Sequence, residues 1–288
     1  MKIAVLSDIH GNHVSFQACM EHLKKEKIDI FVFLGDYVGE FPGIRQSLEM
    51  IRSLSQERTC YVLRGNKEDY QLNGLGGEHP EWDPYPSTIG MFRYGAQSLT
   101  GELRDYIRCL PITDVVKVEG FPDIRICHGS PRDVKEGIYE NAEINDEIFR
   151  EIPENYILCG HTHRVTFLEE YGKTVWNPGS VGVSLDGNPT ARFLILHGEE
   201  GDWRPEFFSI PYDTEQLIRE MKEEGVYEIA PYWTRVSEHL LRGGTMNYLE
   251  VLTLAVKIAR EKYGSCEWPA VPEDCWAEAY EKLIGTYA

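Results

Sequence analysis

The stretch "ILCGHTHR", residues 157 to 164, places two imidazoles directly after an apolar run. His161 and His163 are one residue apart, Gly160 precedes them, and the apolar run begins at Tyr156. Taken alone, a Gly-His-x-His sequence fits a polar turn as well as a metal site, because turns readily accept Gly, Thr and His. A metal site is therefore indicated only if other parts of the chain supply partners for the two imidazoles.

Four other apolar runs end in the same way. Asp8 and His10 follow "KIAVL" (2–6), Asp36 follows "IDIFVFL" (28–34), Asn66 follows "CYVL" (60–63), and His128 follows "IRIC" (124–127). Ligand sites in α/β sheets gather outside the carboxyl ends of the strands. The spacing of Asp8 and His10 also puts both side chains on one face of an extended segment. The sequence therefore predicts that these polar residues meet at one edge of a sheet.

The residue types indicate a catalytic metal site rather than a closed structural zinc site. Carboxylate and imidazole suit zinc, iron, manganese and similar ions, and the seven cysteines are irregularly spaced without a CxxC motif. Two ions about 3.5–4 Å apart share a carboxylate and clamp both oxygens of an in-line displacement. The candidate ligands are Asp8, His10, Asp36, Asn66, His128, His161 and His163.

The pattern along the chain predicts an α/β fold. Short apolar runs alternate with amphipathic helical patterns near the N-terminus, and closely spaced strands follow between residues 124 and 210. We expect two sheets packed face to face with helices outside, a four-layer α/β/β/α sandwich over residues 1–212. Residues 213–288 form a helical C-terminal extension that packs on this domain or lies at a dimer interface.

Two segments leave alternatives open. Residues 74–87 are rich in Gly and Pro, so they contain no regular element and are either a surface excursion or a lid over the site. In "NYLEVLTLAVKIAR" (247–260) the apolar residues recur at helical spacing, which predicts an amphipathic helix. Its apolar stripe belongs either to the core or to an interface.

Composition and charge restrict the partners. The net charge of −18 disfavours long nucleic acids, whereas small phosphates remain compatible because bound cations invert the local field. No apolar run approaches the ~20 residues of a membrane span. The N-terminal run is too short for a signal peptide, so we expect a cytoplasmic protein. We expect a monomer or a homodimer.

The ordered motifs D-x-H, G-D, G-N, H and G-H-x-H resemble the calcineurin-like metallophosphoesterase superfamily over roughly residues 1 to 212. "NPGSVG" (177–182) is similar to the small bacterial and archaeal members. The resemblance implies a two-sheet sandwich that hydrolyses phosphate mono- or diesters with two divalent ions, Mn, Fe, Zn, Co or Ni. The "GNKED" segment and "PYW" in the tail are similar to a bacterial subgroup suggested to cleave dinucleoside polyphosphates such as diadenosine tetraphosphate.

The resemblance also implies a role for each residue by position. Asp8, His10 and His163 would hold the first ion, Asn66, His128 and His161 the second, and Asp36 would bridge them. A hydroxide shared by the ions would attack phosphorus in line. The substrate would be a small phosphorylated molecule, with nucleotides among the candidates. Asn12 would donate toward phosphate or act as an ordinary turn residue, and Arg64 would hold a distal phosphate or lie in solvent.

One position departs from the family pattern. After Gly65-Asn66 many members place a histidine, the proton donor to the leaving group, where this chain has Lys67 followed by Glu68. Lys67 would bind a phosphate oxygen, act as an acid whose pKa two dications depress, or pair with Glu68 on the surface. The residues expected in catalysis are Asp36, Asn66, Lys67 and His128. Those expected to contact substrate are Asn12, Arg64, Asn66 and Lys67.

The leading hypothesis is a two-metal phosphoesterase acting on a phosphodiester or a nucleotide phosphoanhydride. A phosphomonoesterase or a protein phosphatase is the alternative within the same class. A non-catalytic metal or nucleotide sensor is the alternative of another class, motivated by Lys67 in place of the histidine acid. A structural role, with the helical tail as an assembly surface, is the third hypothesis.

Overall fold

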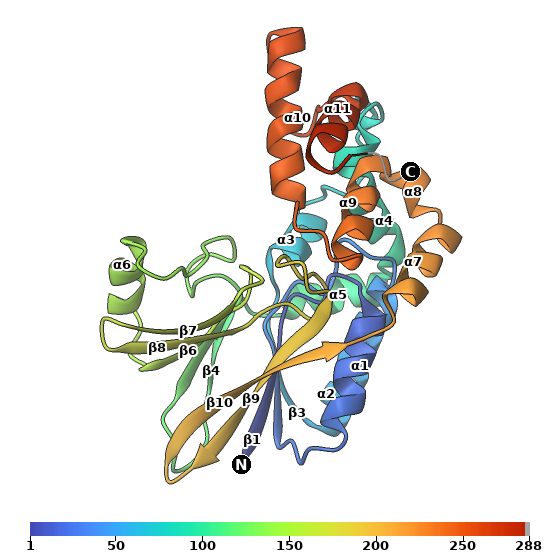
Figure 1. Ribbon diagram of the computed structural model, residues 1–288. Helices are drawn as coiled ribbons and strands as arrows, with labels where there is room; N and C mark the ends of the chain where they lie inside the picture. Colours follow the sequence, from blue (N-terminus) through green and yellow to red (C-terminus); the bar gives the residue numbers. More distant parts are fainter. Residues whose placement is uncertain (286–288) are drawn as a thin grey trace.

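The computed structural model describes residues 1–285, which form two five-stranded sheets and a group of helices beyond one end of them (Figure 1). The first sheet has the order β10-β9-β1-β2-β3 and the second β4-β5-β6-β8-β7. The strands of the first are β1 (Lys2–Leu6), β2 (Ile30–Phe33), β3 (Thr59–Val62), β9 (Thr190–Glu199) and β10 (Asp202–Pro211). Those of the second are β4 (Thr113–Val116), β5 (Ile124–Cys127), β6 (Tyr156–Leu158), β7 (Val165–Glu170) and β8 (Lys173–Pro178).

Each sheet contains a set of three parallel strands. β1 pairs in parallel with β2 and β2 with β3, while β5, β6 and β8 form a second parallel set. The carboxyl ends of these strands therefore lie at one end of the sandwich, as the apolar runs predicted. The runs did not predict β4 and β7. Both are antiparallel edge strands with mixed burial, so they lack the continuous apolar sequence of a central strand.

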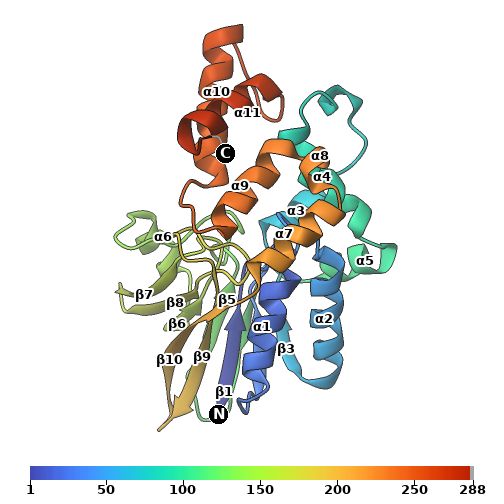
Figure 2. The same cartoon turned by 45° about the vertical axis from the view of Figure 1, so that its right-hand side comes forward.

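The predicted four layers are confirmed. Side chains such as Val5, Val32, Ile126 and Trp176 fill the space between the two sheets. The outer face of the first sheet packs on α1 (His13–Leu23), α2 (Ile44–Glu57) and α5 (Gly101–Cys109), and Figure 2 shows α1 and α2 side by side there. The outer face of the second sheet is covered by α6 (Ile144–Arg150), which contributes Phe149 to the core.

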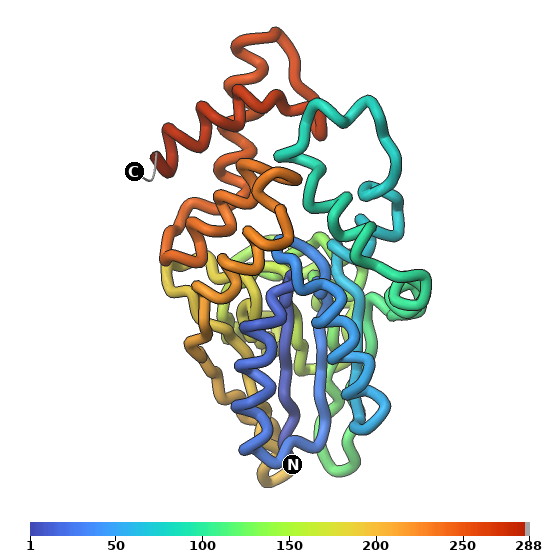
Figure 3. Tube along the Cα trace, turned by 90° about the vertical axis from the view of Figure 1, so that its right-hand side faces the viewer, coloured from blue at the N-terminus to red at the C-terminus, as the bar shows by residue number. Residues whose placement is uncertain are grey.

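The helical extension forms a core of its own beyond the strand ends (Figure 3). It comprises α7 (Thr214–Glu223), α8 (Val226–Ile229), α9 (Pro231–Leu241), α10 (Tyr248–Tyr263) and α11 (Glu273–Leu283), and α4 (Pro86–Ser98) also contributes to this core. Phe41 and Val183, from loops of the sandwich, are also part of this core. Side chains of the extension therefore pack against residues of the sandwich. The division of the chain at residue 212 and a dimer interface formed by the extension stay predictions.

The Gly- and Pro-rich segment 74–87 is mostly irregular, as predicted, and follows α3 (Asn66–Leu72). It contains one turn of 3-10 helix, η1 (Pro80–Trp82), and its last residues begin α4. The ring of Trp82 lies 6.5 Å from that of Trp268 in the extension. The segment therefore packs against the extension rather than projecting freely. Within residues 1–285, no helix has the length and apolar character that crossing a membrane requires.

Candidate metal centre

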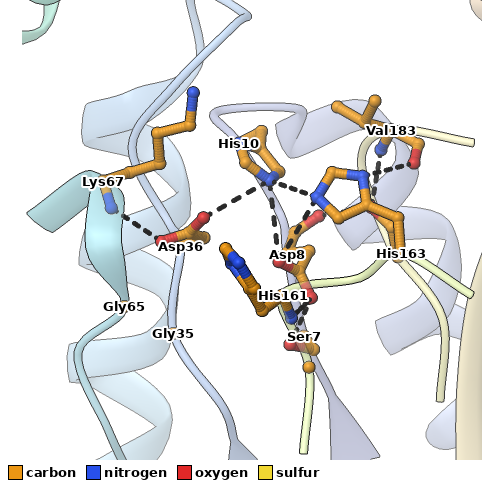
Figure 4. Close-up of polar contacts among 12 residues, drawn as sticks. Ser7, Asp8, His10, Gly35, Asp36, Gly65, Lys67, His161, His163 and Val183 are labelled. Carbon is orange, nitrogen blue, oxygen red and sulfur yellow. Dashed lines mark hydrogen bonds and ion pairs between the residues drawn. The ribbon is translucent and has the colours of Figure 1, made fainter. Parts of the chain in front are cut away.

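The seven predicted ligands converge at the strand ends, and Figure 4 shows five of them there: Asp8, His10, Asp36, His161 and His163. They come from five different segments of the chain. Asp8 and His10 follow β1, Asp36 follows β2, Asn66 begins α3 after β3, His128 follows β5, and His161 and His163 follow β6. The two sheets thus contribute to one cluster, because their parallel strands end at the same end of the sandwich.

Asp8, His10 and His163 form the first group. The Nε2 atoms of His10 and His163 lie 3.0 Å apart, and they are 3.7 and 3.4 Å from Asp8 Oδ1. This oxygen is buried and accepts no hydrogen bond from the described residues. A buried carboxylate oxygen without a donor, facing two imidazole nitrogens, fits the ligand set of a divalent cation.

The second group consists of Asn66, His128 and His161. Asn66 Oδ1 lies 3.0 Å from His128 Nε2 and 2.8 Å from His161 Nδ1. Asp36 lies between the two groups, with Oδ1 3.4 Å from His128 Nε2 and Oδ2 3.7 Å from His10 Nε2. Its carboxylate therefore faces both groups, which is the position that a shared ligand of two ions requires.

The backbone of the cluster is unusual. Five of the candidate ligands have a positive φ: Asp8 (56°), His10 (54°), Asp36 (56°), His161 (65°) and His163 (58°). Non-glycine residues rarely adopt this conformation, and such strain gathers at functional sites. Gly160 is required for a different reason, because the backbone there approaches the side chains of Ser7 and Asp8 closely. A Cβ there would overlap Ser7 Oγ and lie 2.8 Å from Asp8 Oδ2.

Three of the four imidazoles, those of His10, His128 and His163, are held by their outer nitrogens. His163 Nδ1 lies 3.0 Å from the carbonyl of Val183, and His128 Nδ1 lies 2.8 Å from that of Leu34. These contacts orient the rings with Nε2 toward the cluster, as the outer partners of metal-bound histidines do. His10 uses a carboxylate instead, because Glu40 Oε2 lies 2.5 Å from its Nδ1.

Glu40 is a site residue that the sequence patterns did not reveal. Its carboxylate is buried between His10 and Lys67, and it forms an ion pair with the ammonium of Lys67. Burial alone would raise the pKa of Glu40, but Lys67 and His10 outweigh this and lower it. Glu40 ends the segment "GDYVGE" (35–40), in which apolar residues do not recur at helix or strand spacing. Its burial could therefore not be inferred from the sequence pattern.

The titrating groups show how strongly the cluster favours cations. Burial lowers the pKa of His10, yet the carboxylates of Glu40 and Asp8 raise it to about 10. Asp36 likewise outweighs burial at His128 and raises its pKa to about 9. At Asp8 the imidazoles of His163 and His10 overcome burial and hold the pKa well below its usual range. Protons thus occupy nitrogen positions for which divalent ions would compete.

Lys67 is not the surface partner of Glu68. Its backbone N–H donates to Asp36 Oδ1 at 2.8 Å, and its ammonium is paired with Glu40 (Figure 4 shows the backbone contact). Burial opposes the charge, but Glu40 and Asp36 raise the pKa of Lys67 above its ordinary value. With its present neighbours Lys67 is a poor proton donor and a persistent cation.

Glu68 has a positioning role that was also missed. Its buried carboxylate accepts backbone N–H groups from Asp36 (2.9 Å), Tyr37 (2.7 Å), Val38 (3.0 Å) and Gly65 (2.7 Å). It thereby ties the loop after β2 to the start of α3. This contact fixes Asp36 and Asn66 relative to each other.

Two predicted substrate contacts are not brought to the cluster. The buried Asn12 caps α1, accepting from Ser15 N at 3.0 Å, and its amide donates to the carbonyl of Gly182 at 2.9 Å. Arg64 donates to Asp69 Oδ1 at 2.6 Å and to the carbonyl of Leu110 at 2.5 Å. These hydrogen bonds are made within the protein, so both residues have a structural role, and a contact with substrate stays a prediction for each.

Comparison with known proteins identifies the family of the chain. Residues 1–201 match the calcineurin-like phosphoesterase superfamily domain, a match that contains all seven candidate ligands. The chain is also similar to an uncharacterized protein of Methanocaldococcus jannaschii, with 27% identity over 259 residues, covering 84% of this chain and 98% of the relative. That likeness reaches beyond residue 212 into the extension.

Two solved structures are similar over most of the chain. A metallophosphoesterase from Sphaerobacter thermophilus is 25% identical with a TM-score of 0.64, covering 80% of this chain and 98% of that one. A hypothetical protein from Pyrococcus horikoshii is 23% identical with a TM-score of 0.69, covering 85% of this chain and 99% of that one. The second likeness bears on the fold alone.

Proposed function

The chain belongs to the calcineurin-like phosphoesterase superfamily and is a metal-dependent phosphoester hydrolase, and from this premise we propose that it uses two divalent ions to hydrolyse a phosphodiester or a nucleotide phosphoanhydride. The observation that carries the proposal is the position of Asp36, whose two oxygens face different imidazoles. A single ion would need only one of the two groups.

The donor sets fit this pair of ions. The first would be held by Asp8, His10 and His163, the second by Asn66, His128 and His161, with Asp36 contacting both. When bound, the ions supply a nucleophile from water and neutralise charge on the phosphoryl oxygens. Mixed imidazole and carboxylate donors accept manganese, iron, zinc, cobalt or nickel, so availability selects among these metals.

The chain itself contributes a fixed cation. The ammonium of Lys67 is held by Glu40 next to the cluster, and its raised pKa keeps it charged, so it binds a phosphoryl oxygen of the substrate. An ammonium that holds its proton replaces the imidazole acid poorly. The favoured substrates are therefore those whose leaving group needs little protonation, such as phosphoanhydrides and activated diesters.

The proposal also covers the size of the substrate, the cell compartment and the oligomeric state. The net charge of −18 supports a small phosphorylated substrate rather than a long nucleic acid. We place the enzyme in the cytoplasm, as a monomer or a homodimer. A sensor that binds metal and nucleotide without turnover is the second candidate, favoured by the replacement of the histidine acid by Lys67.

Steady-state hydrolysis by chelated enzyme with manganese added back tests the proposal. An aryl phosphate monoester, an aryl phosphate diester and diadenosine tetraphosphate are compared in parallel. We expect metal-dependent turnover, fastest on the diester or the dinucleotide. Asp36→Asn should lower it more than about 100-fold, since even outer partners of metal ligands are worth about 10–100-fold.

Asp105→Asn, an exposed aspartate on α5, is the matched control and should leave turnover unchanged. Full metal occupancy without turnover on any of the three substrates would replace the proposal by the sensor. Fastest turnover on the monoester would show that the leaving-group reasoning about Lys67 is wrong.

A further inference from the structure

A pocket of about 560 Å³ opens beside the metal centre, where α3, α4 and the extension meet. Its lining includes Asn66, Lys67, Tyr70, Phe92, Trp233 and Trp268. Small-molecule sites typically enclose ~300–1,000 Å³, so the pocket is large enough for a ligand. Because Asn66 is also a candidate metal ligand, the pocket and the metal centre share a wall.

One side of the pocket is aromatic. The rings of Tyr70 and Phe92 meet edge to face at 5.6 Å, and those of Phe92 and Trp268 meet edge to face at 6.3 Å. Trp268 remains 47% exposed despite these contacts. A large aromatic side chain left open within a concave site offers a face on which a planar group can stack.

The extension supplies the opposite part of the lining. Trp233 of α9 is stacked on Tyr248 at 4.6 Å and packs against Trp276, so its position is fixed by the core of the extension. Three segments far apart in the sequence, residues 66–92, Trp233 and Trp268, thus meet around one space. The pocket exists only because the extension packs on the sandwich.

Two lysines, Lys67 and Lys135, line the pocket of a chain whose net charge is −18, and the ammonium of Lys67 is paired with Glu40. The ammonium of Lys67 lies 5.7 Å from the ring centre of Trp233, near the metal centre. Lys135 lies over Tyr70 at 4.9 Å, and none of the carboxylates in residues 1–285 forms an ion pair with it. Aromatic faces between two ammonium groups suit a planar ring attached to an anionic chain.

We propose that this pocket binds the base of a nucleotide substrate while its phosphates reach the metal centre past Lys67. The inference rests on the proposed function and adds the substrate class to it. It also assigns the helical extension a role, because Trp268 and Trp233 make the extension the part that selects the substrate. Trp268 is a binding residue that contacts the base. The metal ligands have the same role whichever ester is hydrolysed.

Binding to the manganese-loaded enzyme tests the proposal, with adenosine 5′-monophosphate and ribose 5-phosphate as probes that differ by the base. Tryptophan fluorescence reports binding directly, and inhibition of aryl diester hydrolysis reports it a second time. Stacking of one base on aromatic side chains corresponds to about 5–150-fold in affinity, so the nucleotide should bind tighter by that factor. Trp268→Ala should remove most of this preference, and Trp268→Phe should restore it.

Tyr263→Ala is the matched control, because Tyr263 is a 58% exposed aromatic residue of the same extension outside the pocket lining. It should leave the preference unchanged. Equal affinities for the two probes, in an enzyme that still hydrolyses the diester, would overturn the base pocket and leave the proposed function standing. A base preference that depends on Trp268, in a protein without turnover, would support the pocket and refute the hydrolytic function.

Discussion

The metal centre and the aromatic pocket adjoin at Asn66 and Lys67, but they are built in different ways. The metal centre lies at strand ends, where several ligands adopt a positive φ and three of the four imidazoles are held by carbonyls or by Glu40. The pocket is formed by side chains of helices and loops that meet through apolar packing. Reactive groups are thus positioned by backbone, and the surface that contacts the rest of a substrate is positioned by core packing.

The largest expected effect separates the two regions through Trp276. This fully buried tryptophan packs on Trp233, and its Nε1 donates to Thr88 Oγ1 at 3.0 Å. Trp276→Ala should lower the free energy of unfolding by about 3–5 kcal/mol, because it leaves a cavity and an unpaired hydroxyl. Metal affinity should stay within about twofold, which chemical denaturation and metal titration would measure.

Trp268→Ala is the control for that comparison. Trp268 is exposed, so its removal should change stability by less than about 1 kcal/mol. A loss of metal affinity in Trp276→Ala at temperatures where it is folded would show that the extension supports the metal centre. The two regions would then be one structural unit.

The next effect concerns the backbone of the metal centre. A methyl group at Gly160 would overlap Ser7 Oγ and displace Asp8, so Gly160→Ala should weaken metal binding by about 10–100-fold. Isothermal titration with manganese measures this directly. At Gly101 an added Cβ meets no atom within 4 Å, so Gly101→Ala should bind as the parent does. Equal binding by both variants would contradict the close fit between Gly160 and Asp8.

A smaller effect is expected from pH. The metal-free pKa values of about 10 for His10 and about 9 for His128 mean that each ion displaces a proton near neutral pH. The affinity for each ion should therefore rise about tenfold per pH unit between about pH 7 and 9. Absorbance titrations with cobalt at several pH values would show it. An affinity independent of pH would mean that the imidazoles are already neutral.

The same shifts give a sign for stability. A pKa raised in the folded state stabilises the metal-free protein fully below the unfolded value of about 6.5. This contribution is lost as pH rises through the folded values of about 9 to 10. The midpoint temperature of thermal unfolding of the chelated protein should therefore fall as the pH rises from about 6.5 to about 10. The manganese-loaded protein should show a smaller fall, because its imidazoles carry metal instead of protons.

Much of the site could be read from local pattern. An apolar run followed by a polar residue, with a glycine close to that residue, marks a buried strand and its carboxyl end, and parallel strands bring such ends together. Hence β1 and β5 coincide with "KIAVL" and "IRIC", and the side chains that follow the strands lie in one cluster, while their role as metal ligands stays a prediction. The edge strands β4 and β7 carry no such signal, because half-exposed strands do not need continuous apolar sequence.

Contacts between segments distant in the chain determined the remainder. No local rule shows that Glu40 is buried between His10 and Lys67. Nor does one show that Asn12 and Arg64 form hydrogen bonds with other groups of the protein. Nor does local pattern show that Trp268 lies beside Phe92. The positions of strand ends follow from short-range periodicity and hydrogen bonding, which depend on residues that are close together in the sequence. The partner of a buried charge or an aromatic ring depends on how whole elements pack, and this is set only when the chain has folded.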